Sequence, residues 1–288
     1  MLGEVIAALP ATAPVDASYR AWLSRHIDDP QLVEALIGLT FIVTYDHDPG
    51  RLSAAFVHDR LRRGGRHVRY VEGGWAPMID TLAARAIDLG VELRRGARVR
   101  SVPDGPTILA TTLSTARRLM GDPDLDWPGT RVALFDLGLR PAASVGWFRV
   151  FDLDQRIYAA RYSEADPTLA PEGHHLIQIA AALAPGEPFT AVLARVHELL
   201  DSTAHGWADD VDWKRAYELS NETGAVDLPG TGWPDRPAVL RTRSVALATD
   251  HSAAPGLLTE VAHNAARSAI ATFSDAPTGS ASQASVHG

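Results

Sequence analysis

The segment from Val68 to Val102 has the most informative pattern of apolar and polar positions in the chain. Apolar residues in its middle recur every three or four positions, which places them on one face of a helix. This face consists of Met78, Ile79, Leu82, Ala83, Ala86 and Leu89. Asp80, Arg85 and Asp88 face the other way. The pattern predicts an amphipathic α-helix.

Strand patterns flank this helix on both sides. Gly73 and Gly74 form the turn into the helix, and Gly90 supplies the left-handed residue that ends it. Val91 and Leu93 then alternate with charged residues, and this period of two is typical of a half-covered strand. The segment therefore predicts a strand, a Gly-Gly turn, a helix and a second strand in one α/β layer. Such a layer usually serves a nucleotide cofactor.

The rest of the chain has a different organisation. Residues 1–67 have a helical pattern that breaks at Asp46–Gly50. Residues 131–183 hold four alternating or apolar runs separated by turn residues, which predict an antiparallel sheet of about four strands. A helix over Phe189–Leu200 and a further strand, VDWKRAYEL, follow. The sheet region is therefore predicted as an insertion between two pieces of one α/β domain.

Composition and charge narrow the possible functions. Hydrophobic residues make up 46% of the 288 residues, enough to fill a core, and the net charge of −8 argues against nucleic acid as a partner. The absence of cysteine excludes disulfides and thiolate chemistry and fits a cytoplasmic location. No apolar run reaches the roughly 20 residues of a membrane span. A soluble protein is expected, with peripheral membrane contact left open.

The region around Asp250 is the second place where the pattern suggests chemistry. Asp250 closes an apolar strand, and Pro255, Gly256, Leu257 and Leu258 follow as the predicted start of a helix. A helix start presents free N–H groups and the positive end of a dipole, and a carboxylate at a strand end can accept hydrogen bonds from a polyol. An ordinary βα loop with a capping aspartate is the alternative interpretation.

Together these segments resemble the flavin-dependent amine oxidase and phytoene desaturase superfamily. Tyr70–Val102 is similar to the family segment in which Gly-Gly opens a long helix leading to a Gly-Val strand. Ala248–Ala269 is similar to its C-terminal flavin motif, and Pro229–Pro237 to the glycine- and proline-rich approach to the last strand. The resemblance covers most of the chain, to about Ala271.

The resemblance implies FAD as cofactor and assigns roles to seven residues. Val99 would meet the adenine through its backbone, and Asp250 would bond the ribityl or pyrophosphate part. The helix start at Gly256, Leu257 and Leu258 would point at the flavin ring, where its dipole stabilises negative charge. The turn near the boundary of the cofactor and substrate regions corresponds to Gly73 and Gly74. The implied reaction is hydride removal from a C–H bond of a small apolar or amine substrate, with no catalytic residue named.

One expected element of the family has no match in the sequence. The GxGxxG turn that binds the FAD pyrophosphate is absent, and the nearest glycine cluster, Gly230 and Gly232, has no helix after it. FAD is therefore expected to bind weakly or not at all to this chain alone. A separate polypeptide would supply the unit, or the chain would form a homo-oligomer. A non-catalytic binding relative with a degenerate cofactor site is the alternative function.

The implied fold class is α/β (α+β). It consists of an incomplete FAD/NAD(P)-binding Rossmann-like domain and an inserted substrate domain with a mixed or antiparallel sheet plus helices. The expected divisions are 1–67 and 126–234 for the substrate domain, 68–125 and 235–273 for the FAD domain, and 274–288 for a disordered tail.

Other candidate chemistry is sparse. The sequence has no HExxH motif, and His174 and His175 adjoin a strand in which neighbouring side chains point to opposite faces, so no metal site is expected. Five aromatic residues either line an apolar substrate cavity or belong to the core: Trp22, Tyr45, Trp75, Trp147 and Tyr158.

Overall fold

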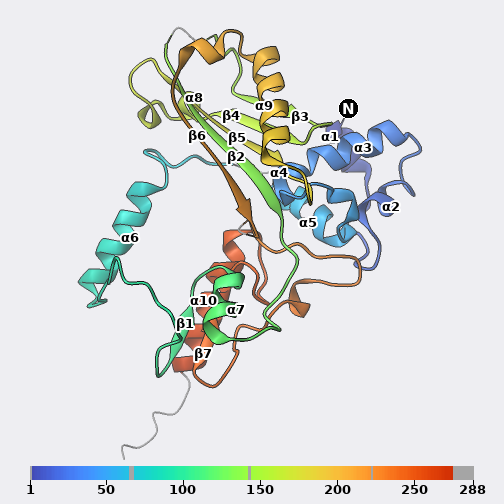
Figure 1. Ribbon diagram of the computed structural model, residues 1–288. Helices are drawn as coiled ribbons and strands as arrows, with labels where there is room; N and C mark the ends of the chain where they lie inside the picture. Colours follow the sequence, from blue (N-terminus) through green and yellow to red (C-terminus); the bar gives the residue numbers. More distant parts are fainter. Residues whose placement is uncertain (1, 65–67, 142–143, 222, 275–288) are drawn as a thin grey trace, which may run out of the picture. The chain divides into compact units, whose positions relative to one another are not determined.

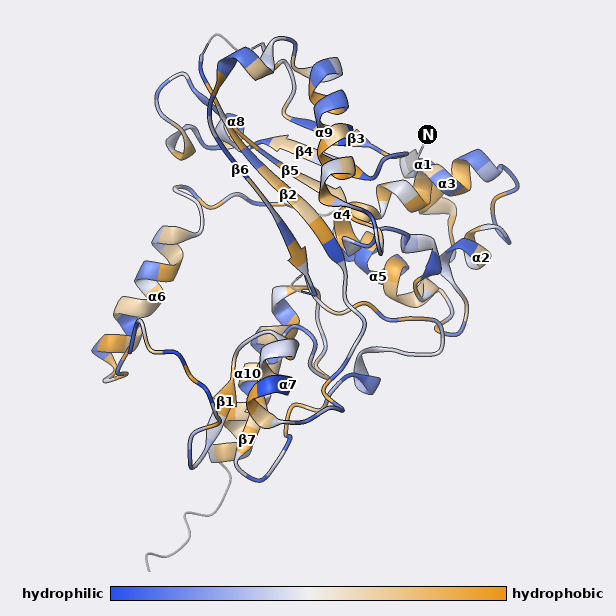
Figure 2. Cartoon of the chain, in the orientation of Figure 1, coloured by the Kyte–Doolittle hydropathy of each residue, from blue (hydrophilic) through white to orange (hydrophobic). Residues whose placement is uncertain are grey.

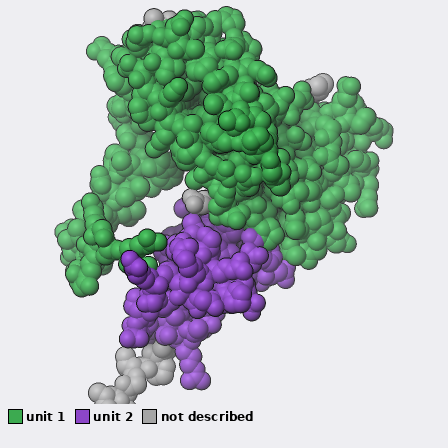
Figure 3. All heavy atoms as spheres, viewed as in Figure 1, with its two compact units in different colours: residues 1–99, 128–232 green, residues 100–127, 233–288 purple. Residues whose placement is uncertain are grey.

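The computed structural model describes residues 2–64, 68–141, 144–221 and 223–274 (Figure 1). These residues form two compact units, each assembled from two stretches of chain (Figure 3). Unit 1 comprises residues 1–99 and 128–232, and unit 2 comprises residues 100–127 and 233–288. The predicted tail falls almost entirely on residues 275–288, which lie outside the described part.

The first part of unit 1 is a helical lobe. Its helices begin where local side chains cap them: Ser18 accepts the Ala21 N–H, and Asp29 accepts the Gln31 N–H ahead of a proline at the first helical position. Trp22 lies in the apolar core of this lobe. The elements of the lobe are α1 (Leu2–Ala8), α2 (Tyr19–Leu23), α3 (Pro30–Leu39), α4 (Phe41–Thr44), η1 (Pro49–Arg51) and α5 (Ala54–Gly64).

The second part of unit 1 is a five-stranded antiparallel sheet with the order β3-β4-β5-β2-β6. This confirms the sheet predicted from the alternating runs. Its strands are β2 (Arg131–Leu139), β3 (Arg149–Asp152), β4 (Ile157–Arg161), β5 (His175–Ala182) and β6 (Val211–Ser220). Short helical segments connect them: α8 (Tyr162–Ala165), η2 (Pro167–Leu169) and η3 (Trp207–Asp210).

The two faces of this sheet have different environments. Alternate residues of the strands, such as Phe135 and Ile179, pack against α9 (Phe189–Thr203) and form the largest apolar core. Figure 2 shows the apolar residues along the central strands. The opposite face is covered at one end by Phe41 and Tyr45 from the α4 region. The remainder of this opposite face carries the polar residues described below.

The segment after the helical lobe differs from its prediction. The helix forms as α6 (Ala76–Asp88), but the strands predicted around Val68–Glu72 and Val91–Arg94 are absent. None of the residues of α6 is buried, although its sequence has the apolar stripe of an amphipathic helix. A helix can form from local contacts, whereas a strand needs a neighbouring edge to pair with, and no described residue of unit 1 provides one for these segments.

Unit 2 contains a small parallel sheet. Thr107–Leu109 (β1) pairs with Val245–Leu247 (β7), so the strand predicted to run on to Asp250 is only three residues long. Leu109, Leu113 and Leu247 share an apolar core on this sheet. The helical elements of the unit are α7 (Leu113–Met120), η4 (Trp233–Asp235) and α10 (Thr259–Ser274). Among the described residues of the whole chain, no helix has both the length and the apolarity needed to cross a bilayer.

Candidate functional site

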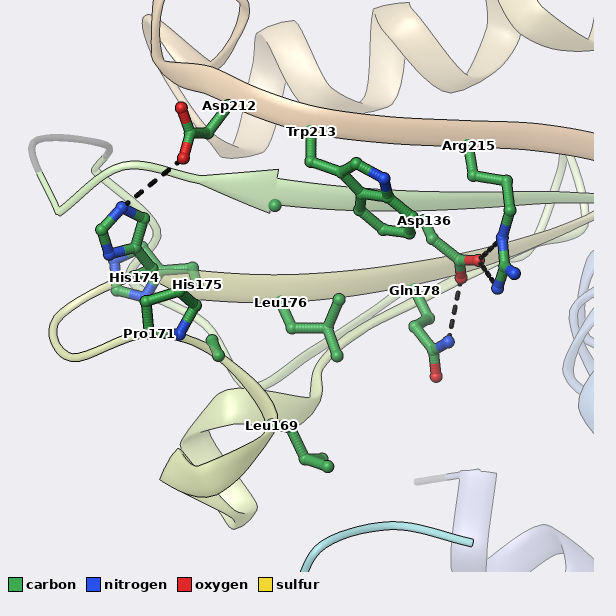
Figure 4. Close-up of a pocket in the computed structure, with 12 residues that line it drawn as sticks. Asp136, Leu169, Pro171, His174, His175, Leu176, Gln178, Asp212, Trp213 and Arg215 are labelled. Atoms are coloured by element: carbon green, nitrogen blue, oxygen red, sulfur yellow. Dashed lines mark hydrogen bonds and ion pairs between the residues drawn. The ribbon is translucent and has the colours of Figure 1, made fainter. Parts of the chain in front are cut away.

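A cavity of about 400 Å³ opens on the sheet face opposite α9 (Figure 4). Its walls come from three adjacent strands, β5, β2 and β6, and from the loop between η2 and β5. Its lining combines polar and apolar groups, as in sites that orient a small molecule. The lining residues are Asp136, Gly138, Leu169, Ala170, Pro171, His174, His175, Leu176, Gln178, Asp212, Trp213 and Arg215.

A three-residue polar row crosses the floor of this cavity. Asp136 on β2 lies directly opposite Gln178 on β5 and Arg215 on β6, so strand register brings the three side chains together. The Gln178 amide donates to Asp136 Oδ1 at 2.9 Å, and Arg215 Nε donates to Asp136 Oδ2 at 2.8 Å. The carboxylate is buried, so these donors stabilise a charge that water does not solvate. In turn, the hydrogen bond to Asp136 raises the pKa of Arg215.

Sequence reasoning missed this row, although a signal was present. Asp136 and Gln178 each interrupt a strand that is otherwise apolar. A buried polar residue such as Asp136 usually has a hydrogen-bond partner, so it is a candidate for a site or a specificity device.

The other end of the cavity holds two histidines. His174 Nε2 lies 3.7 Å from Asp212 Oδ2, and His175 is also among the lining residues. Within the described ranges, no three histidine, aspartate or glutamate side chains gather as a metal site requires. These groups can instead donate and accept hydrogen bonds.

Beyond the cavity, the same sheet face carries tyrosines. Tyr70 contacts both Phe148 and Tyr162 edge-on at ring-centroid distances of 5.8 Å. Burial raises the pKa of Tyr158 and of Tyr162, and burial also raises the pKa of Tyr45. These phenols therefore stay neutral and act as hydrogen-bonding groups on an apolar surface.

The structure places the five aromatic candidates in different environments. Tyr45 and Tyr158 share the sheet face described above. Trp22 is a core residue of the helical lobe, and Trp147 packs on the α9 side, where its indole donates to the Thr203 carbonyl at 2.8 Å. Trp75 is 67% exposed. None of the five lines the cavity described above, and the two tyrosines pack against an apolar cluster on the same sheet face.

The Gly73–Gly74 turn lies beside a loop that lines the cavity. Both glycines have positive φ, and the Gly73 N–H donates to Asp166 Oδ2 at 2.7 Å. A Cβ on Gly74 would come within 3.2 Å of Leu169, one of the cavity residues. The Thr168 hydroxyl and then the Gly73 N–H lower the pKa of Asp166. Asp166 therefore ties this turn to the cavity rim.

Val99, the predicted adenine contact, lies outside any strand. Its side chain is 56% exposed. Its backbone is not part of a sheet ladder. The role of Val99 therefore stays a prediction.

In unit 2, Asp250 and His251 form a pair. His251 Nδ1 lies 2.8 Å from Asp250 Oδ1, and the Asp250 side chain is 28% exposed. His251 is buried, and its Nε2 has no hydrogen-bond partner among the described residues. The pair therefore offers a partly exposed carboxylate whose orientation is fixed by a neighbouring ring.

The helix expected to start at Pro255 starts four residues later, at Thr259. Gly256 to Leu258 form a turn instead, and the Leu257 N–H donates to Glu260 Oε2 at 2.9 Å. A Cβ on Gly256 would lie 2.7 Å from Glu260 Cβ, so this turn requires glycine, which also suits its φ of 127°. The start of α10 is thus satisfied by a carboxylate from its own first turn.

Comparisons with known proteins show what this fold is similar to. Neither the protein-family models nor the curated proteins give a match to the sequence. Solved structures do match: an oxidoreductase from Methanosarcina mazei, 16% identical, has a TM-score of 0.70 over 91% of this chain and 68% of its own. Cyclohexylamine oxidase from Brevibacterium oxydans, 12% identical, has a TM-score of 0.58 over 95% and 73%.

A variant of putrescine oxidase gives a similar result, with 14% identity and a TM-score of 0.58 over 95% of this chain and 73% of its own. The identities are low, so these matches concern the fold. The mixed α/β architecture, with one parallel and one antiparallel sheet, is the fold of oxidoreductase structures that include amine oxidases.

Proposed function

We propose that the protein is a flavin-dependent oxidoreductase that removes a hydride from a C–H bond of a small apolar or amine substrate. The observation that carries this proposal is the fold, which matches an oxidoreductase and two amine oxidases over 91% to 95% of this chain. The cavity on the antiparallel sheet is the proposed substrate site. FAD, when bound, would supply the hydride acceptor.

The cavity residues have clear tasks in this proposal. Leu169, Leu176 and the indole of Trp213 would hold the apolar part of the substrate. Gln178 and the histidines would orient its polar groups through hydrogen bonds. Asp136 is already neutralised by Arg215, so it would hold the floor rigid.

The residues proposed for FAD fit the cofactor to different degrees. Asp250 fits, because a partly exposed carboxylate can accept hydrogen bonds from hydroxyl groups of the ribityl chain. The turn at Gly256–Leu258 fits less well, because the Glu260 carboxylate already accepts the Leu257 N–H and would repel an anionic group. We propose that FAD binds weakly to this chain alone and that a separate polypeptide supplies the pyrophosphate loop.

The test is a titration of FAD with the purified chain, followed by flavin fluorescence. Weak, saturable quenching is expected, and Asp250→Ala should abolish it. Asp124→Ala removes another exposed carboxylate of unit 2 and serves as the matched control, with unchanged quenching expected. Equal quenching by wild type and Asp250→Ala would show that Asp250 does not contribute to the proposed flavin site. The absence of any quenching, with the chain alone and with the polypeptide that supplies the pyrophosphate loop present, would overturn the proposed cofactor.

A further inference from the structure

The exposed apolar residues of this protein are concentrated in one segment. Of the 19 large hydrophobic residues exposed among the described residues, 12 lie between Val68 and Val99. Isolated exposed apolar residues are normal, but a contiguous group of this kind marks an interaction surface. The group consists of Val68, Tyr70, Val71, Trp75, Met78, Ile79, Leu82, Ile87, Leu89, Val91, Leu93 and Val99.

The centre of this surface is the apolar stripe of α6. Ile79, Leu82 and Leu89 are 58%, 63% and 66% exposed, although helical spacing places them together on one face. Figure 2 shows apolar residues on α6 and at its C-terminal end. A 13-residue helix is marginally stable in water without packing. The sequence of α6 is therefore suited to a helix that is covered on one side.

The residues after α6 have the pattern of a strand that lacks a partner. Val91 and Leu93 alternate with Glu92 and Arg94, whose side chains pair with each other at 2.7 Å. Within the described chain, no main-chain hydrogen bond joins residues 92–106 to a main-chain group outside this segment. An extended segment with this alternation is ready to pair with the edge of a sheet.

The parallel sheet of unit 2, taken by itself, supports the same type of partner. Two strands of three residues form the whole sheet, whereas parallel sheets normally have more strands and are covered on both faces. The Leu247 N–H donates to the Val239 carbonyl, so the outer edge of β7 is partly paired. The outer edge of β1 carries no strand among the described residues.

We propose that Val68–Val99 is the docking surface for an α/β unit that lies outside residues 1–288. Strands of that unit would pair with the two strand-like flanks of α6, and the completed sheet would cover the helix stripe. The solved structures are consistent with a further unit, since 91% and 95% of this chain match only 68% and 73% of two neighbours. The remainder of each neighbour has no counterpart in this chain.

The main-chain groups decide between this partner and others. A lipid surface could cover the stripe of α6, but its hydrocarbon offers no strand edge with which the extended residues 91–94 could pair. A strand edge satisfies both the backbone and the apolar side chains. A second copy of this chain would contribute a second uncovered stripe and a second unpaired segment. Dimerisation of this chain alone is therefore tested as a separate outcome.

This inference extends the proposed function by naming the surface that completes the flavin site. Its test therefore uses no flavin. The probe is the polypeptide encoded immediately upstream of this chain, expressed separately and mixed with the full chain. Light scattering gives the mass of the complex, and hydrogen exchange gives the protection of the α6 amides. Leu82→Glu disrupts the stripe, and Ile270→Glu on α10, where Ile270 is 56% exposed, is the matched control.

A 1:1 complex is expected in which the amides of residues 76–94 gain protection. Leu82→Glu should abolish the complex, and Ile270→Glu should leave it unchanged. Four results would overturn the proposal: an upstream sequence without an α/β unit, a complex that Leu82→Glu does not weaken, a dimer of this chain alone with protected α6, or α6-dependent binding to vesicles of phosphatidylcholine and phosphatidylglycerol. Failure of flavin binding in an intact complex would instead count against the proposed function.

Discussion

Asp136 and Arg215 lie directly opposite each other on neighbouring strands, and the Arg215 guanidinium holds the buried Asp136 carboxylate at 2.8 Å. Gln178, opposite Asp136 on the other side, donates to its second oxygen. The carboxylate thus has a donor from each adjacent strand. The row crosses the cavity floor, where a rigid polar group can orient a ligand.

Removal of this carboxylate should destabilise unit 1. Asp136→Ala removes the charged acceptor of two hydrogen bonds. Because Gln178 and Arg215 are exposed and can bind water instead, a decrease of about 1 kcal/mol in the free energy of unfolding is expected. Urea unfolding measures it. Asp154→Ala at an exposed turn should change stability by no more than about 0.5 kcal/mol. An equally small change for Asp136→Ala would show that the row contributes little.

The uncovered state of α6 gives a second prediction. Leu82→Ala should leave the stability of the chain almost unchanged, within about 0.5 kcal/mol, because Leu82 is 63% exposed. Leu200→Ala on α9 should cost about 2–5 kcal/mol, because Leu200 is 1% exposed in the main core. Urea unfolding of the two variants compares them. A large loss for Leu82→Ala would mean that its side chain packs within the chain.

Asp166 gives a prediction about pH. Its pKa is lowered by the Thr168 hydroxyl and the Gly73 N–H, so its stabilising effect is complete above the unfolded value of about 3.9. That effect is lost as the pH falls through the lower folded pKa. In thermal unfolding, the Tm of the wild type should be higher than that of Asp166→Asn at pH 6, and this difference in Tm should shrink below about pH 4. A difference independent of pH would contradict the ionised form as the acceptor.

Glu260 gives a prediction about the start of α10. Glu260→Gln keeps the shape of the side chain and removes its charge, so helix stability should decrease by about 0.3–1 kcal/mol. The same change removes a negative group from the proposed flavin site, and FAD binding should tighten by up to about fivefold, equivalent to about 1 kcal/mol. Fluorescence titration measures the affinity. Weaker FAD binding would indicate that Glu260 supports the site.

Local patterns predicted some elements correctly and others incorrectly, for physical reasons. The alternation in residues 131–220 predicted the antiparallel sheet, because each strand finds its partners within this stretch. Helical spacing predicted α6, because a helix depends on contacts three and four residues apart. The strands on either side of α6 did not form, because strand formation depends on a partner that the pattern itself does not contain.

The candidate site was less accessible to sequence reasoning. Asp136 and Arg215 are 79 residues apart, and only strand register brings them together. Pro255 favours an early helix start, but the interaction of Glu260 with Leu257 moves the start to Thr259. The resemblance to flavin enzymes pointed to the fold that the solved structures share, whereas the roles of Gly73, Val99 and Asp250 remain predictions.

The visible absorbance of the chain purified together with the unit that docks on Val68–Val99 tests both proposals at once. We predict a yellow complex with one flavin per chain. We also predict that Leu82→Glu, which prevents docking, leaves the chain colourless. A colourless complex that gains no flavin absorbance when FAD is added would show that the complex does not hold flavin.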